Sequence, residues 1–332
     1  MIQAFRTQRR ALLAAVAATA LPLPALAQAY PSRPVRLVVP FPPGNTSDIL
    51  ARLVAEELQR RLGATLVVEN RPGASGALGV QAVSGARPDG LTLLVTTQSP
   101  LVINPPLTRN LPYDPIRDLA PIALFARTGF ALVVAPDFPA RTMAEAAALL
   151  RAAPPGLYTA ANPGLGTMSH LAMELLAHSL GARVESVPYR GSSAALLDLA
   201  AGRVQLMIDG FNSALPQAQG GRARLLGVVA RQRSPLAPDA PSMAESGVAE
   251  LAGLEAMSWT GLLGPAGTAP EVVAWWNAAL RQVMGDPAVA SKLAQTYIEA
   301  VVPGGPEPFA REIASDLAKW TGVVRDARIE PQ

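Results

Sequence analysis

The stretch VRLVVPFPPGNTSD, residues 35–48, carries the signal that decides the fold. Its first five residues form a short apolar run, which is typical of a buried strand. Glycine and hydroxyl residues then make a turn, and beyond it apolar side chains recur at helical spacing as far as Gly63. The stretch therefore predicts a strand, a turn and a helix in succession.

Both ends of this helix contain residues that are suited to capping. We expect Ser47 to cap its start and Gly63 to close its end. Asp48 would then lie in the first turn, where the helix dipole favours an anion. We expect Asp48 to stabilise the helix in this way.

The same alternation of strands and helices continues along the chain. Apolar runs predict further strands at residues 65–69, 91–96, 131–135, 158–161, 184–187, 206–209, 225–230 and 256–263. Periodic apolar positions predict helices at residues 143–152, 169–180, 193–201, 212–219 and about 308–325. This order is typical of an α/β fold with parallel sheets covered by helices. Two irregular connectors, residues 100–121 and 233–253, suggest a second domain inserted into the first.

Residues 1–29 have the three regions of a secretory signal peptide. Three arginines precede an uncharged apolar run over residues 11–27, and small residues offer cleavage sites near residue 27 or 29. The run is too short for a transmembrane anchor, and Pro22 and Pro24 interrupt it. We expect an exported, soluble mature protein in the periplasm, by the general secretory or the twin-arginine route.

The composition excludes several classes of site and partner. The chain has no cysteine, so disulfides, thiolate metal sites and cysteine nucleophiles are excluded. His170 and His178 lie eight residues apart, whereas a helical metal pair prefers three or four, so we expect no metal site. Without the three arginines of the leader, 25 basic residues balance 25 acidic ones. We therefore expect no nucleic-acid partner.

Enzyme motifs are nearly absent. The chain has no nucleophile elbow, phosphate-binding P-loop, zinc-protease motif or EF-hand loop. Residues 164–169, GLGTMS, approach the dinucleotide fingerprint GxGxxG, but Ser169 replaces its third glycine. We expect no cofactor and no enzyme activity, and an exported Rossmann-like enzyme stays the minor alternative.

Three predicted turns between a strand and a helix share a composition suited to anions. Residues 44–48, 164–169 and 191–193 combine glycines with hydroxyl side chains. Glycine lets a ligand approach the backbone, and the start of each following helix offers N–H donors and a positive dipole end. One such turn would be an ordinary capped helix. Three of them favour a small carboxylate held in a cleft.

Nearly the whole mature chain resembles one family of proteins. The resemblance rests on the ordered motifs YPSRP (30–34), LVVPFPPG (37–44), VENRPGA (68–74), PDG (88–90), LPYDP (111–115), VPYRGS (187–192), RSP (233–235), LLGPAGT (262–268) and KW (319–320). In these motifs the chain is similar to the Bug family of periplasmic solute receptors, the binding components of tripartite tricarboxylate transporters. The resemblance implies a two-lobed, type II periplasmic-binding-protein (Venus flytrap) fold, each lobe a mainly parallel sheet flanked by helices. Residues 30–128 and 236–332 would form lobe 1, and residues 129–235 lobe 2.

The resemblance also implies which loops bind the ligand. Carried over by motif, the ligand-binding residues would be Phe41, Gly44, Asn45, Thr46, Ser47, Asp48, Gln98, Ser99, Gly164, Leu165, Gly166, Thr167, His170, Gly191, Ser192, Ser193, Asp209 and Asn212. Family members commonly have glycines where this chain has Asn45 and Thr46, so the identity of the ligand does not carry over. Asp209 would repel a bound carboxylate unless it points away or pairs with a ligand ammonium group. Arg190 either pairs with a second ligand carboxylate or is a solvated surface charge.

The expected function follows from the cleft and the resemblance. We expect a monomeric receptor that captures a small carboxylate for the inner-membrane permease subunits of a tripartite transporter. The alternative is a receptor that reports the ligand to a sensor protein.

Overall fold

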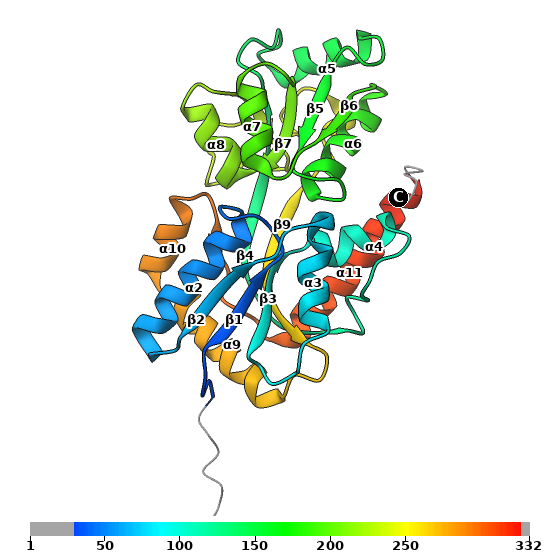
Figure 1. Ribbon diagram of the computed structural model, residues 1–332. Coiled ribbons are helices and arrows are strands. Elements are labelled where there is room, and N and C mark those ends of the chain that lie inside the picture. The colour runs from blue at the N-terminus through cyan, green and yellow to red at the C-terminus, as the bar shows by residue number, and fades with distance from the viewer. Residues whose placement is uncertain (1–29, 327–332) are drawn as a thin grey trace, which may run out of the picture. The chain divides into compact units, whose positions relative to one another are not determined.

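The computed structural model describes residues 30–326, and from Arg33 onward the chain forms one compact unit. Within this unit strands and helices alternate as expected (Figure 1). The signal peptide predicted for residues 1–29 lies outside the described residues. No helix between residues 30 and 326 combines the length and the apolar character needed to cross a membrane.

One sheet, sheet A, begins with the stretch that opened the sequence. β1 (Val35–Val39) pairs in parallel with β2 (Leu66–Asn70) and β3 (Thr92–Thr97). β9 (Met257–Pro265) joins β3 antiparallel and also pairs with the first part of β4 (Leu119–Val134). The short β10 (Glu299–Ala300) completes the sheet on β4.

A second sheet, sheet B, contains the last part of β4. This part of β4 pairs antiparallel with β7 (Leu206–Gly210) and β8 (Arg224–Val228). β5 (Thr159–Asn162) pairs in parallel with β6 (Glu185–Pro188) and β7. β4 is therefore shared by both sheets.

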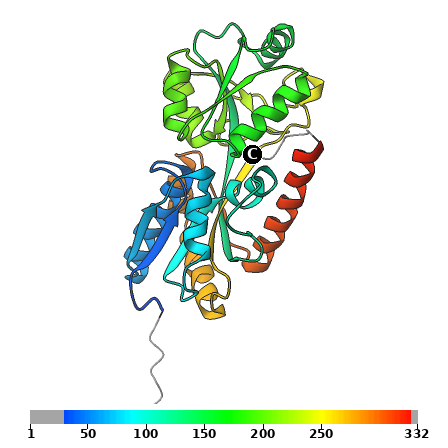
Figure 2. The ribbon, with the colours of Figure 1, turned by 45° about the vertical axis from the view of Figure 1, so that its right-hand side comes forward.

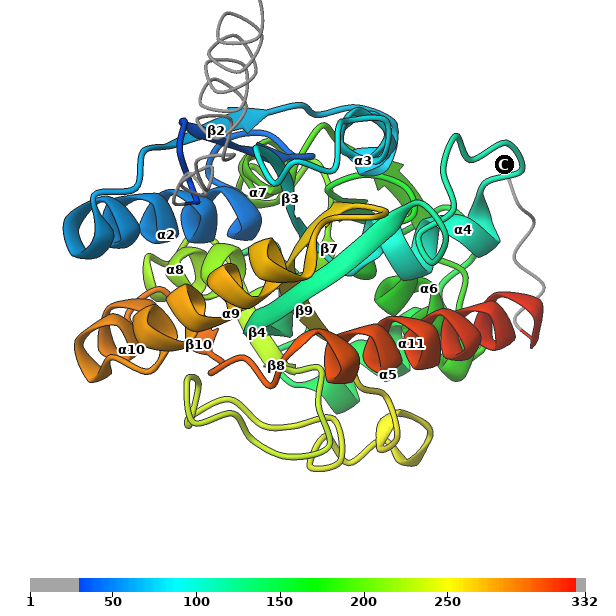
Figure 3. The same ribbon diagram turned by 90° about the horizontal axis from the view of Figure 1, so that it is seen from below.

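Helices surround each sheet and make two lobes (Figures 1 and 2). The first lobe is sheet A with α2 (Thr46–Leu62), α3 (Ala77–Ser84), α4 (Asn104–Leu107), α9 (Pro270–Met284), α10 (Pro287–Ala294) and α11 (Pro306–Asp326). The second lobe is sheet B with α5 (Met143–Ala152), α6 (Met168–Leu180), α7 (Ser192–Ala200) and α8 (Phe211–Gln219). Seen from below, α9 and α11 lie on either side of β4 (Figure 3). Short helical turns η1 (Ala74–Gly76), η2 (Ser99–Ile103) and η3 (Ala249–Leu251) complete the elements.

The α/β fold is confirmed, but the expectation of mainly parallel sheets is wrong. β4 and β9 run antiparallel to each other and to every strand with which they pair. Both sheets are consequently mixed. Mixed sheets of this kind are common in α/β proteins with added antiparallel strands.

The connector predicted for residues 100–121 is also partly wrong. η2 and α4 occupy residues 99–107, and β4 begins at Leu119 rather than at residue 131. The register of β4 against β9 shifts between Pro121 and Ala123. Proline is tolerated at such a bulge, because no ladder hydrogen bond is needed there. This bulge explains how a proline-rich segment enters a long strand.

The caps of α2 correct one detail of the sequence prediction. Asn45, and not Ser47, is the N-cap: its side chain accepts a hydrogen bond from the Ser47 N–H at 2.9 Å. Gly63 closes the helix in the left-handed conformation, as predicted, with φ of 66°. Glycine adopts this conformation without the steric cost that other residues meet.

The segment that follows β8 packs against the second lobe. The Met243 N–H donates to the Ala230 carbonyl at 2.9 Å, and Val228 forms a parallel bridge with Ser242. η3 contacts α6. The lobe boundaries predicted at residues 129 and 236 stay a prediction.

Aromatic packing joins α11 to β9. The rings of Trp259 and Phe309 meet edge to face with centroids 5.0 Å apart, and both side chains are fully buried. Gly261 leaves the space for Phe309, because a Cβ at this position would lie 2.2 Å from the ring. Trp259 also donates its indole N–H to Asp316 at 2.8 Å. These contacts hold α11 along the strand that passes between the lobes.

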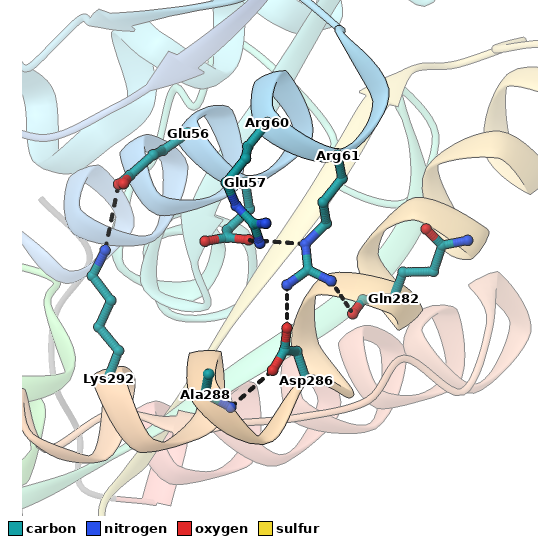
Figure 4. Close-up of polar contacts among 8 residues, drawn as sticks. All are labelled: Glu56, Glu57, Arg60, Arg61, Gln282, Asp286, Ala288 and Lys292. Carbon is teal, nitrogen blue, oxygen red and sulfur yellow. Dashed lines mark hydrogen bonds and ion pairs between the residues drawn. The ribbon is translucent and has the colours of Figure 1, made fainter.

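Ion pairs on the surface connect α2 with α10 (Figure 4). Arg61 donates to Glu57 at 2.8 Å and also to Asp286, which caps α10. Lys292 lies 3.4 Å from Glu56. Lys292 and Glu56 are both exposed, and an exposed pair contributes at most about 1 kcal/mol. Their role here is to fix the relative position of two helices of the first lobe.

Candidate ligand-binding site

A cavity of about 300 Å³ lies where the two lobes face each other. It is bordered by the turns after β1, β5, β6 and β7, by the start of η2, by the second half of β4 and by the first half of β9. Ligands of α/β proteins bind at such carboxyl ends of strands, where helices begin. The cavity is large enough for a small organic molecule.

Most of the residues predicted for the site line this cavity. They are Phe41, Gly44, Asn45, Thr46, Ser99, Thr167, Gly191, Ser192, Ser193, Asp209 and Asn212. The others do not line it: Ser47, Asp48, Gln98, Gly164, Leu165, Gly166 and His170. The structure thus brings all three predicted turns to one cavity, while some of their residues serve the surrounding scaffold.

Asp48 belongs to the scaffold. Its carboxylate accepts hydrogen bonds from the Gly44 N–H at 2.9 Å and the Asn70 amide at 2.9 Å, and pairs with Arg52. Burial by itself would raise the pKa of Asp48, but the hydrogen bonds from Arg52, Gly44 and Asn70 outweigh burial and lower the pKa. The ionised Asp48 therefore holds the turn that borders the cavity without facing the cavity.

In the turn of residues 164–169, two backbone N–H groups donate hydrogen bonds to other residues of the protein. The Gly166 N–H donates to His170 Nδ1 at 3.3 Å, and the Met168 N–H donates to the Ser99 hydroxyl at 3.1 Å. These donors were expected to serve the ligand. Ser99 lies in the first lobe and Met168 in the second, so this turn contributes a contact between lobes.

His170 is a structural residue at this turn. Its side chain is half-buried, and burial lowers its pKa, so the ring is neutral near pH 7. Because Nδ1 accepts from Gly166, the proton of the neutral ring lies on Nε2, which is 3.6 Å from Glu174. Within the described part of the chain, no group of three or more potential metal ligands occurs.

The starts of α7 and α8 differ from the other helix starts at the cavity. Their N-cap residues are Gly191 and Gly210, and neither offers a side chain to cap the helix. Asn45 and Thr167, by contrast, cap α2 and α6 with their side chains. The first N–H groups of α7 and α8 are therefore available to a ligand, at the positive ends of two helix dipoles.

Arg190 adds a charge to this part of the cavity. It lines the cavity immediately before α7, and its side chain is exposed. Among residues 30–326 it forms no ion pair. Two uncapped helix starts and an arginine without an acidic partner together favour an anion.

Asp209 is the acidic residue of the cavity. It is 4% exposed, and its Oδ1 accepts a hydrogen bond from the Ser169 hydroxyl at 3.0 Å. Burial raises the pKa of Asp209 to about 6, although Ser192, the Gly210 N–H and Ser169 act in the opposite direction. Oδ2 is buried and has no hydrogen-bond partner among the described residues.

The sequence prediction missed the part of the cavity wall that the strands β4 and β9 form. Thr128 and Phe130 come from β4, and Ser258 and Thr260 come from β9. Each pair is two residues apart, so both members lie on one face of their strand. The alternating hydroxyls of Ser258 and Thr260 in an otherwise apolar strand were the only signal in the sequence.

The lobes contact each other directly around the cavity. The Thr46 hydroxyl donates to Asn212 Oδ1 at 3.1 Å, and the Ser75 hydroxyl donates to the Leu165 carbonyl. Thr46 and Ser75 lie in the first lobe, and Asn212 and Leu165 lie in or border the second. Hydrogen bonds therefore join the two lobes directly beside the cavity.

The chain is similar to known proteins over most of its length. Residues 50–329 match the model of the "Tripartite tricarboxylate transporter family receptor" family. The chain is 33% identical to protein BugT of Bordetella pertussis over 312 residues, 94% of each chain.

Two solved structures with ligands are also similar. Rpa4515 of R. palustris with adipate has a TM-score of 0.86 and 33% identity, covering 91% of this chain and 100% of its own. MatC of Rhodopseudomonas palustris with bound malate has a TM-score of 0.81 and 31% identity, covering 89% and 100%. The resemblance found in the sequence motifs is thereby confirmed. The chain belongs to the tripartite tricarboxylate transporter receptor family, whose members are periplasmic solute-binding proteins with two lobes.

Proposed function

We propose that the protein captures a small organic acid in the cavity between its lobes and presents it to the permease subunits of a tripartite transporter. The observation that carries the proposal is the pair of uncapped helix starts, α7 and α8, beside Arg190, which has no ion-pair partner among residues 30–326. The adipate and malate bound by two similar proteins support a carboxylate as the ligand.

The ligand carboxylate binds at the start of α7 in this proposal. The N–H groups of Ser192 and Ser193 and the Ser193 hydroxyl act as donors, and Arg190 supplies a positive charge. Backbone donors at a helix start are already oriented, so they bind an anion with little loss of conformational freedom. A neutral amide would gain much less from the same dipole.

Closure follows from contacts with both lobes. A ligand at the start of α7 in the second lobe also faces Asn45 and Thr46 of the first lobe. The hydrogen bond between Thr46 and Asn212 then forms alongside the ligand. Binding energy thus favours the closed arrangement over an open one, which is a hinge-type transition.

We propose binding without a chemical reaction. Ser169 donates a hydrogen bond to Asp209 in the cavity wall, but the serine of a Ser-His-Asp triad donates to a histidine, and the aspartate only orients that histidine. Neither His170 nor His178 lines the cavity, so this serine has no histidine base. The ligand is expected to leave the protein unchanged.

Export to the periplasm is part of the proposal. Residues 1–29 act as a cleaved signal peptide, and the periplasmic location of the family supports this. Amino-terminal sequencing of the protein from a periplasmic extract should find a start near Gln28 or Tyr30. Protein recovered with Met1 intact in the membrane fraction would contradict it.

A thermal-shift screen of the mature protein tests the proposed function. Small mono-, di- and tricarboxylates are compared with the corresponding uncharged amides at pH 7.5. An acid at about 100 times its Kd should add roughly 2.7 kcal/mol to the free energy of unfolding. At least one acid should raise the unfolding temperature while its amide does not. If no acid does so, or if amides act equally, the protein does not select carboxylates.

A further inference from the structure

Two buried oxygen atoms in the cavity wall have no hydrogen-bond partner within residues 30–326. They are Asp209 Oδ2 and Thr128 Oγ1, and the two side chains are only 4% and 5% exposed. Both residues line the cavity. Leaving a buried polar atom unpaired costs free energy, and a carboxylate oxygen costs more than a hydroxyl. Unpaired groups beside a cavity therefore point to a ligand that pairs with them.

The contrast with Asp48 argues against a scaffold role for Asp209. Both oxygens of Asp48 are bonded, to Gly44, Arg52 and Asn70, and this residue does not reach the cavity. Asp209 has a bonded Oδ1 and an unpaired Oδ2. Of these two buried acids, the one that lines the cavity is thus the one with an unpaired oxygen.

The position of Asp209 relates it to the carboxylate site. Ser192, the first residue of α7, lies close enough to Asp209 to act on its ionisation, as does the N–H of Gly210 at the start of α8. Asp209 and the uncapped start of α7 line the same cavity. A ligand bound at α7 by its carboxylate brings its adjacent carbon towards Asp209.

We propose that Asp209 accepts a hydrogen bond from a hydroxyl or ammonium group on the carbon next to the ligand carboxylate. The protein would then prefer 2-hydroxy and 2-amino acids over the unsubstituted acids of equal length. This inference rests on the proposed function, since it needs a carboxylate at the start of α7. Thr128, whose hydroxyl is also unpaired, is the second polar group available to such a ligand.

The chemistry explains why an acid is present in an anion site. The donors of α7 and Arg190 attract the carboxylate, and the ionised Asp209 attracts a neighbouring donor. A site built to pair with a ligand donor discriminates strongly against analogues without it, because its own acceptor then stays unpaired. An unsubstituted acid would also meet repulsion from Asp209 without compensation.

Matched series of acids test this proposal by calorimetry at pH 7.5. Succinate, malate and aspartate share one carbon skeleton and differ only at the second carbon; glutarate, 2-hydroxyglutarate and glutamate form a longer series. In at least one series a substituted acid should bind ten times more tightly than its parent. Malate and aspartate also distinguish a hydroxyl from an ammonium donor.

The variant Asp209→Asn should reduce this preference to less than threefold. The affinity for the parent acid should stay the same or increase, since a negative charge is removed. Asp239→Asn is the matched control, because Asp239 is exposed and outside this cavity. Its affinities should equal those of the wild type, and thermal unfolding shows that each variant is folded.

The possible failures are distinguishable. If carboxylates bind but substituted and parent acids bind equally, the inference about Asp209 is wrong and the proposed function stands. Equal losses for parent and substituted acids in Asp209→Asn also overturn it. Uptake of about one proton on binding, measured in buffers of different ionisation enthalpy, would mean that Asp209 is a donor to the carboxylate, which contradicts the proposal. If no carboxylate binds at all, the proposed function itself fails.

Discussion

The substitution Ser193→Asp separates the stability of α7 from its proposed role in binding. Ser193 is the second residue of the helix, is exposed, and follows an N-cap without a capping side chain. An aspartate at this position interacts favourably with the helix dipole, by about 0.3–1 kcal/mol. The folded state should therefore be as stable as the wild type or slightly more stable.

The same carboxylate competes with the ligand. Two like charges 4 Å apart repel each other by about 1 kcal/mol in bulk water and by about 4 kcal/mol at an effective dielectric constant of about 20. The start of α7 lies between these limits, because it is part of a cavity but has exposed side chains. We expect the affinity for the best acid to fall about a hundredfold, which corresponds to roughly 2.7 kcal/mol.

Calorimetry with the best acid from the screen measures this loss. The control is Ala144→Asp, which adds the same charge at the second, exposed position of α5, outside the cavity. The control should bind with unchanged affinity. Wild-type affinity in Ser193→Asp would refute the reasoning, because the ligand carboxylate could then not lie at the start of α7.

Three further predictions concern stability and motion. Burial raises the pKa of Asp209 from 3.8 to about 6, so the folded state binds this proton more tightly than the unfolded chain does. The contribution of Asp209 to stability should therefore be complete below about pH 4 and be lost as the pH rises through 6, by up to about 3 kcal/mol. In urea titrations the free energy of unfolding of the wild type, relative to that of Asp209→Asn, should fall by this amount over the same range, and identical pH profiles of the two proteins would contradict it. Gly261→Ala should destabilise the fold by about 1–3 kcal/mol in urea unfolding, since its Cβ would lie 2.2 Å from Phe309, and an unchanged midpoint would show that α11 shifts freely. Small-angle scattering should give a smaller radius of gyration with the best acid than without it, whereas equal profiles at saturation would exclude ligand-driven closure.

The elements that could be predicted from the sequence are those with a local signal. β1, β3 and β7 are buried strands that appear as apolar runs, and Gly63 ends α2 as its position suggested. The first half of β4 also contains an apolar run, residues 122–126, but this run directly follows a proline-rich segment and was not assigned to a strand. Pro121 argues against a strand at this point, and the register shift that accommodates it cannot be read from the sequence. The two ends of β4 also belong to different sheets.

Residues of the site were likewise predicted where the sequence carries a local signal and missed where it does not. The turns at the ends of β1 and β6 were found because glycines and hydroxyls gather there in the sequence. Thr128 and Ser258 were missed, because only the passage of β4 and β9 between the sheets brings them to the cavity. The hydrogen bond from the Met168 N–H to the Ser99 hydroxyl could not be predicted either, because the two residues are 69 positions apart in the chain.

A crystal structure of the mature protein with its best acid is the most direct test of the central claim. We predict that the ligand carboxylate lies in the cavity between the lobes, within hydrogen-bond distance of the N–H groups of Ser192 and Ser193. Arg190 should turn towards it. A ligand bound outside this cavity, or one whose carboxylate lies away from α7, would contradict the account.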